Sequence, residues 1–181
     1  MQNAVFDEFV KSQQEPTDPE IDWNLRRDEW LQHLEELYSQ IHQFLKEYIE
    51  SGQMQFESRP IELSEDYIGS YEARQVNLRI GRKLLKFQPV GTLLLGSKGR
   101  VDVIGPGVTA ARLVLIDSKV TRASDLARVH VGEGSEPSMV PKSESRKIKW
   151  EWKMVTRPPE RRFIELTQET FFQMIMEVAN G

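Results

Sequence analysis

The chain has 181 residues, 39% hydrophobic and 29% charged, which is enough apolar material for the packed core of one ordinary domain. It has no cysteine, which excludes disulfides, thiolate metal sites and cysteine nucleophiles. The longest aliphatic run, Leu113–Ile116, is too short to span a bilayer, and Asp7 and Glu8 interrupt the first apolar stretch, unlike a secretory signal. We therefore expect a soluble protein of the cytoplasm.

The formal net charge of −4 hides an asymmetry between the two parts of the chain. Residues 1–72 contain 17 acidic and 5 basic residues, whereas residues 73–181 contain 11 acidic and 19 basic residues. The basic part could present a surface to a polyanion such as nucleic acid. Alternatively, the acidic part packs against the basic part and the two fields cancel, which we favour because a tethered acidic segment would compete with phosphate.

The chain order predicts an N-terminal extension over residues 1–16, with a possible short helix around Phe6 and Phe9, followed by a single domain over residues 17–181. A long helix is expected from Pro19 to Glu50 within the segment 17–52. Thr17 and Glu20 have capping-box spacing, proline suits the first helical turn, and Gly52 can end the helix.

The apolar side chains of this helix recur at alternating intervals of four and three, at Trp30, Leu34, Leu37, Ile41, Phe44 and Tyr48. We expect this stripe to pack on a sheet of the same chain. The same spacing forms a heptad seam, so pairing with another chain is the alternative. The helix is also long for a small sheet, which leaves an overhanging end as a possible partner-binding surface.

The segment 53–131 is β-rich, with short apolar runs separated by tight glycine turns. Alternation in Tyr71–Ile80, followed by Gly81 and Arg82 and then Lys83–Gln88, predicts a hairpin. The other expected strands of this segment are Ile61–Ile68, Thr92–Leu95, Arg100–Ile104, Arg112–Asp117 and, more weakly, Leu126–Val131.

Residues 132–146 lack apolar periodicity and are expected to form a mobile loop. Lys147–Val155 and Phe163–Leu166, within the segment 147–166, are the last expected strands, and Thr167 should cap a closing helix over 167–181. The fold class is therefore α+β, a long N-terminal helix and a short C-terminal helix packed on a mostly antiparallel sheet.

The stretch Gly99–Lys119 resembles the core of the PD-(D/E)xK nuclease superfamily, in which one strand carries an aspartate and the next an acidic-x-lysine element. The resemblance implies catalytic roles for Asp102, Asp117 and Lys119. The two carboxylates would hold Mg²⁺, and the lysine would orient water or support phosphate charge. The resemblance covers 21 of the 181 residues, and Val101 stands where the motif has proline.

Basic and aromatic residues alternate from Arg146 to Lys153. Such a strand could bind nucleic acid, with bases stacked on tryptophan and phosphates near Arg146, Lys147, Lys149 and Lys153. Side chains of consecutive residues point to opposite faces, so we favour a buried tryptophan face and a solvated lysine face that is available to a partner.

Three functions follow from these features. The first is a non-enzymatic interaction or accessory protein without a cofactor, whose partner, expected to be another protein, binds the long helix or a sheet edge. The second is the Mg²⁺-dependent nuclease, and the third is a nucleic-acid-binding protein without catalysis.

Overall fold

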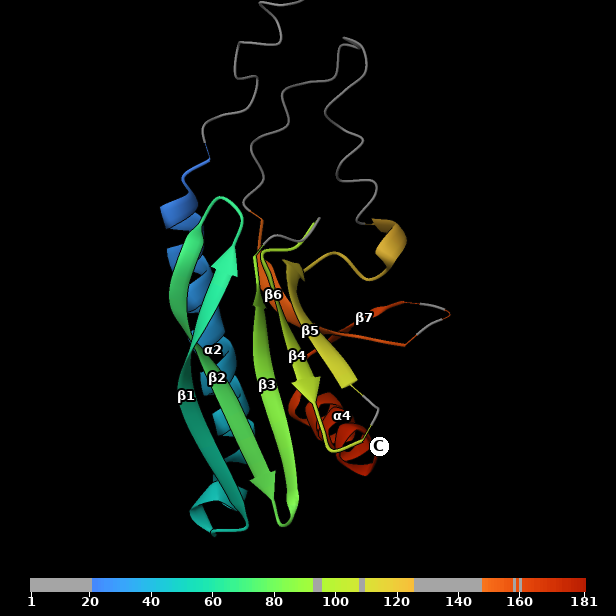
Figure 1. The fold of residues 1–181 in the computed structure, drawn as a ribbon. Coiled ribbons are helices and arrows are strands. Elements are labelled where there is room, and N and C mark those ends of the chain that lie inside the picture. The colour runs from blue at the N-terminus through green and yellow to red at the C-terminus, as the bar shows by residue number, and fades with distance from the viewer. Residues whose placement is uncertain (1–20, 93–95, 108–109, 126–147, 158, 160) are drawn as a thin grey trace, which may run out of the picture.

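A computed structural model describes residues 21–92, 96–107, 110–125, 148–157, 159 and 161–181. A long helix, α2 (Trp23–Glu50), precedes the strands, and a shorter helix, α4 (Gln168–Asn180), follows them. The seven described strands form one sheet in chain order, and all neighbours are antiparallel. Figure 1 views this sheet with both helices behind it. The α+β fold expected from the sequence is confirmed.

The predicted hairpin is present, with Ile80 opposite Lys83 across its turn. The first strand begins at Met54, seven residues before the predicted start at Ile61. The prediction missed this part of the strand because polar residues and Pro60 interrupt the alternation of apolar side chains there. The N-terminal extension, the run Leu126–Val131 and the loop over residues 132–146 lie outside the described residues. The strands are β1 (Met54–Glu65), β2 (Gly69–Ile80), β3 (Lys83–Gly91), β4 (Gly99–Ile104), β5 (Ala110–Asp117), β6 (Trp150–Val155) and β7 (Phe163–Glu165).

Helix α2 begins four residues later than predicted. Asp22 is its N-cap, and the Asp22 side chain accepts a hydrogen bond of 3.0 Å from the Leu25 amide. The helix ends where expected, because Ser51 is its C-cap and Gly52 adopts a positive φ of 75°. None of the described helices is long and apolar enough to cross a membrane.

The apolar stripe of α2 packs on the sheet, as favoured from the sequence. Trp30, Leu34, Leu37 and Ile41 are buried in the core that α2 and α4 share with the sheet. The 28-residue helix is about 42 Å long at about 1.5 Å per residue, and the 12-residue β1 spans about 40 Å at about 3.3 Å per residue. The helix and the β1–β2 hairpin are therefore matched in length.

Burial along β2 changes phase near Gln75. Tyr71 and Ala73 are buried before this point, whereas Val76 and Leu78 are buried after it. The register with β1 stays one-to-one, so no bulge causes the change, and β2 pairs with β3 only from Val76 onward. The hairpin therefore twists away from β3 and turns its other face to the core; Figure 1 shows its strands crossing.

Polar side chains close the gap that this twist opens, and we call this region the hairpin junction: Tyr38, Glu65, Tyr71 and Thr92. The Tyr38 hydroxyl donates to the Arg74 carbonyl at 2.8 Å. Tyr71 donates to the Glu65 carboxylate, which also accepts from the Thr92 amide at 2.8 Å and the Thr92 hydroxyl at 3.0 Å. Burial raises the pKa of both tyrosines, and the Glu65 contact raises the pKa of Tyr71 further.

The two edges of the sheet are poorly suited to pairing with another strand. Edge strand β1 contains Pro60, which has no N–H to donate, and exposed charged residues at Glu57, Arg59 and Glu62. The opposite edge, β7, is three residues long. Both features are typical of edges that resist strand addition.

Candidate binding surface

The structure does not bring the two predicted metal-binding carboxylates together. Asp102 on β4 lies opposite Arg112 on β5 in the strand register, so these side chains share one face of the sheet. Asp117 lies five residues beyond Arg112, an odd number, and therefore on the opposite face and about 16 Å further along the strand. Among the described residues, no group of three or more His, Asp or Glu side chains could hold a metal ion.

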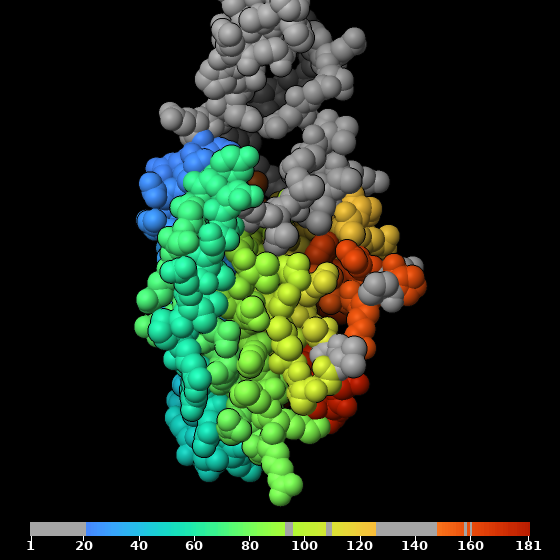
Figure 2. All heavy atoms as spheres, in the orientation of Figure 1, coloured from blue at the N-terminus to red at the C-terminus, as the bar shows by residue number. Residues whose placement is uncertain are grey.

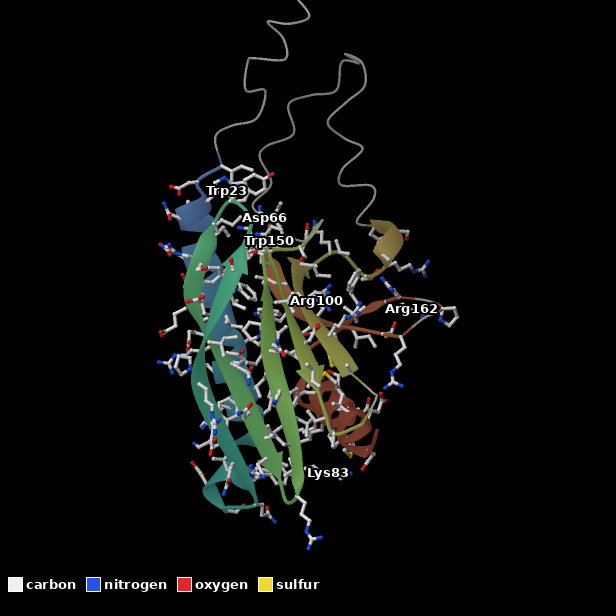
Figure 3. All side chains as sticks on the ribbon, in the orientation of Figure 1. Trp23, Asp66, Lys83, Arg100, Trp150 and Arg162 are labelled. Atoms are coloured by element: carbon white, nitrogen blue, oxygen red, sulfur yellow. The ribbon has the colours of Figure 1, made fainter. Side chains whose placement is uncertain are left out.

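Both predicted catalytic carboxylates have local structural partners. Both Asp102 oxygens accept from Arg100, at 2.7 and 2.6 Å, and these hydrogen bonds raise the pKa of the arginine. Asp117 accepts at 3.0 Å from the amide of Lys119, which lies in the turn after β5, so strand alternation does not orient it. Figure 3 shows Arg100 on the sheet.

The predicted basic surface of β6 is only partly available. Lys149 is exposed and pairs with Glu151 at 2.6 Å. Lys153 is buried, at 5% exposure, because the turn after β5 folds over it, and its Nζ donates to the carbonyls of Ser118 at 2.7 Å and Val120 at 2.8 Å. The expectation of a solvated lysine face is therefore wrong at Lys153. Arg146 and Lys147 lie outside the described residues.

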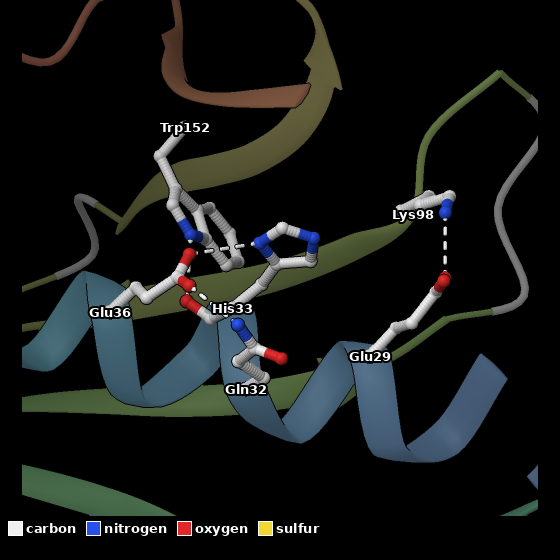
Figure 4. Close-up of polar contacts among 6 residues, drawn as sticks. All are labelled: Glu29, Gln32, His33, Glu36, Lys98 and Trp152. Carbon is white, nitrogen blue, oxygen red and sulfur yellow. Dashed lines mark hydrogen bonds and ion pairs between the residues drawn. The ribbon is translucent and has the colours of Figure 1, made fainter. Parts of the chain in front are cut away.

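Ion pairs connect the acidic helix to the basic part of the chain. Glu29 pairs with Lys98 at 2.7 Å, and Glu35 pairs with Arg74 at 3.5 Å. Figure 4 shows the first pair beside a second contact between helix and sheet, in which Trp152 Nε1 donates to the His33 carbonyl at 3.0 Å. These contacts fix α2 against the inner side of the sheet.

The opposite side of the sheet is covered by neither helix, and we call it the outer face (Figure 2). Cross-strand register places its side chains in rows. One row runs from Glu57 through Asn77 and Lys86 to Ile104, and a second runs from Gln88 through Asp102 to Arg112. Across β1–β5 these rows and their neighbours present Gln55, Glu57, Arg59, Gln75, Asn77, Arg79, Leu84, Lys86, Gln88, Arg100, Asp102, Ile104, Ala110 and Arg112.

Positive charge exceeds negative charge on this face. Its two carboxylates already have cationic partners, Arg59 with Glu57 at 3.0 Å and Arg100 with Asp102. Arg79, Lys86 and Arg112 are exposed, and their side chains form no ion pair or hydrogen bond with any described residue. These three residues, which lie on β2, β3 and β5, are the cationic diagonal.

A hollow of about 330 Å³ lies at one end of the diagonal, where β1, β2 and β3 meet. Arg59, Arg79 and Lys86 line it together with Glu57, whose carboxylate pairs with Arg59, and with Asn77, which is 8% exposed. Gln75 Nε2 donates to Asn77 Oδ1 at 3.0 Å, which leaves the Asn77 Nδ2 donor without a partner among the described residues. The hollow thus combines positive charge with an unused amide donor.

The cationic diagonal was not predicted from the sequence. Arg79 and Lys86 occupy outward positions of the predicted hairpin, between Leu78 and Ile80 and between Leu85 and Phe87, so strand alternation contained the signal. What was missing was the register, which decides that these residues share a face with Arg112. No protein-family model, curated protein or solved structure significantly matches this chain.

Proposed function

We propose that this protein is a non-enzymatic accessory protein that holds a polyanionic macromolecular partner on its outer face. The observation that carries the proposal is the cationic diagonal, three exposed cations on a sheet face that neither α2 nor α4 covers. Cations without an internal partner attract a polyanion over long range and release its counterions on contact.

The other candidate surfaces have less to offer a partner. Helix α2 uses its apolar stripe in the core of the chain, and its exposed side carries most of its six carboxylates. The sheet edges contain a proline-interrupted strand and a three-residue strand. The outer face is the remaining large surface of the described part of the chain.

The position of the face also answers the objection that the acidic N-terminal part neutralises the basic part. Glu29 and Glu35 of α2 pair with Lys98 and Arg74, whereas the cationic diagonal lies on the side of the sheet away from α2. The sheet and core separate the helix carboxylates from the diagonal. This separation allows one molecule to be acidic overall and still present a local cationic surface.

The test is retention on a heparin column, a generic polyanion, as salt is raised. The triple variant Arg79→Gln, Lys86→Gln, Arg112→Gln should elute at lower salt than the unmodified protein, because it loses the charges on the face. A matched control, Arg27→Gln, Lys46→Gln, Arg157→Gln, removes the same number of charges from side chains already paired with carboxylates. Equal elution of the two triple variants would show that net charge, not the outer face, governs binding.

A further inference from the structure

The described residues of the outer face provide no exposed aromatic side chain on which unpaired bases could stack. Strands β2–β5 contain two aromatic residues, Tyr71 and Phe87, and both are buried in the core. Binding of single-stranded nucleic acid by a sheet depends on exposed aromatic side chains against which bases pack. The groups that this face does offer, guanidinium, ammonium and amide, are those that contact phosphates.

The cationic diagonal has the dimensions of a contact along a double helix. Arg79 and Arg112 are separated by three strand spacings of about 4.8 Å and by four residues of about 3.3 Å each, which places their Cα atoms about 20 Å apart. Lys86 lies between them. At about 3.4 Å per base pair, the diagonal spans about six base pairs of a duplex.

The hollow supplies a defined contact at one end of this line. Asn77 and Lys86 are directly opposite each other on β2 and β3, and Arg79 is the next outward residue of β2. The free Nδ2 of Asn77 therefore lies beside two cations that have no internal partner. A phosphate oxygen can accept from the amide while Arg79 and Lys86 balance its charge. The Glu57 carboxylate opposite Asn77 is itself paired with Arg59.

From these three observations we infer that the partner is double-stranded nucleic acid, bound through its phosphate backbone without base readout, and that the hollow at Asn77 takes one phosphate. The inference rests on the proposed function and narrows it, because it names the polyanion. Amide and cationic groups that reach phosphates carry no sequence information, so two duplexes of different sequence should bind equally.

The first experiment measures fluorescence anisotropy of the full chain with a short labelled duplex and with either of its single strands, at several salt concentrations. The duplex should bind more tightly, and the logarithm of its association constant should fall with the logarithm of salt concentration with a slope of about −2.7, for three phosphate contacts. Each of Arg79→Gln, Lys86→Gln and Arg112→Gln should reduce the magnitude of the slope by about one.

The second experiment tests the hollow without changing charge. Asn77→Leu should weaken duplex binding about tenfold, the usual scale for losing a hydrogen bond to a charged group, and should leave the salt slope unchanged. Gln88→Leu is the matched control, because Gln88 is an exposed amide on the same face that does not line the hollow. Equal affinities of the two variants would overturn the phosphate site.

The outcomes separate the inference from the function on which it rests. Tighter binding of the single strand, or heparin retention through the diagonal without nucleic-acid binding, would overturn the inference and leave the proposed function in place. The latter result would indicate an acidic protein or another polyanion. If the protein binds neither heparin nor nucleic acid, both the inference and the proposed function are overturned.

Discussion

At the hairpin junction the half-buried Glu65 carboxylate accepts hydrogen bonds, whereas on the outer face three cationic side chains are exposed and unpaired. Glu65 accepts from Tyr71 and from two groups of Thr92, and these contacts hold the tip of the hairpin to the end of β3. The side chains of Arg79, Lys86 and Arg112 form no ion pair or hydrogen bond within the described part of the chain. Polar residues that stabilise the fold therefore differ in their contacts from polar residues that are free to bind, and substitutions in the two groups should differ in their effect on stability.

The largest loss of stability is expected at Glu65. Glu65→Gln should lower the free energy of unfolding by about 3 kcal/mol, because hydrogen bonds to a charged group are replaced and a new amide donor faces the Thr92 donors. Urea unfolding at neutral pH measures the change. Glu62→Gln is the control, an exposed carboxylate on the same strand, and a similar loss there would remove the special role of Glu65.

Lys153 and Lys149 provide the same contrast between a buried, hydrogen-bonded side chain and an exposed one, here for lysine. Lys153→Met should cost about 2 kcal/mol of unfolding free energy, because the carbonyls of Ser118 and Val120 lose their donor. Lys149→Met changes an exposed lysine four residues before Lys153 and should alter the unfolding free energy by less than about 0.5 kcal/mol. Equal effects in chemical denaturation would contradict the assignment of Lys153 as structural.

Tyr38 and Tyr71 of the hairpin junction should make the folded protein less stable at alkaline pH. Their pKa values are raised in the folded protein, so the neutral hydroxyl is favoured there and ionisation favours unfolding. The stabilising contribution is complete below about pH 10, the unfolded pKa, and is lost as the pH rises beyond it. Urea midpoints measured from pH 8 to 11 should therefore fall at the upper end.

Tyr38→Phe distinguishes this source from general alkaline unfolding. The variant should be about 1 kcal/mol less stable at pH 8, because the Arg74 carbonyl loses its donor, and its stability should fall less steeply above pH 10. Tyr48→Phe changes an exposed tyrosine on the same helix and serves as the control. Identical pH dependence in Tyr38→Phe and the unmodified protein would assign the alkaline loss to other groups.

Periodicity predicted the elements well and the site poorly. The three-and-four spacing from Trp30 to Ile41 correctly placed the buried face of α2, and alternation around Val76 and Phe87 correctly placed the hairpin. Both signals are local. The face of Asp102 relative to Asp117 depends on which residue of β5 lies opposite Asp102, and this register is decided by the turn and by packing.

Lys153 and the phase change in β2 show the same limit. Alternation places Lys153 on the outer side of β6, which is correct, but the turn after β5 then covers it. Likewise, residues of β2 alternate throughout, yet the buried set changes near Gln75 because the hairpin leaves the sheet there. Both outcomes depend on contacts between segments that are distant in sequence.

The smallest stability change should come from the outer face. The triple variant Arg79→Gln, Lys86→Gln, Arg112→Gln removes no ion pair or side-chain hydrogen bond of the described chain, so its unfolding free energy should stay within about 0.5 kcal/mol of the unmodified protein. Thermal and urea unfolding measure this directly. These cations repel one another across the face, so removing them can raise the unfolding free energy slightly. Any such gain should be larger at low salt, where the repulsion is screened less. A loss above about 1 kcal/mol would mean that the cations stabilise the fold, and the contrast with Glu65 would then fail.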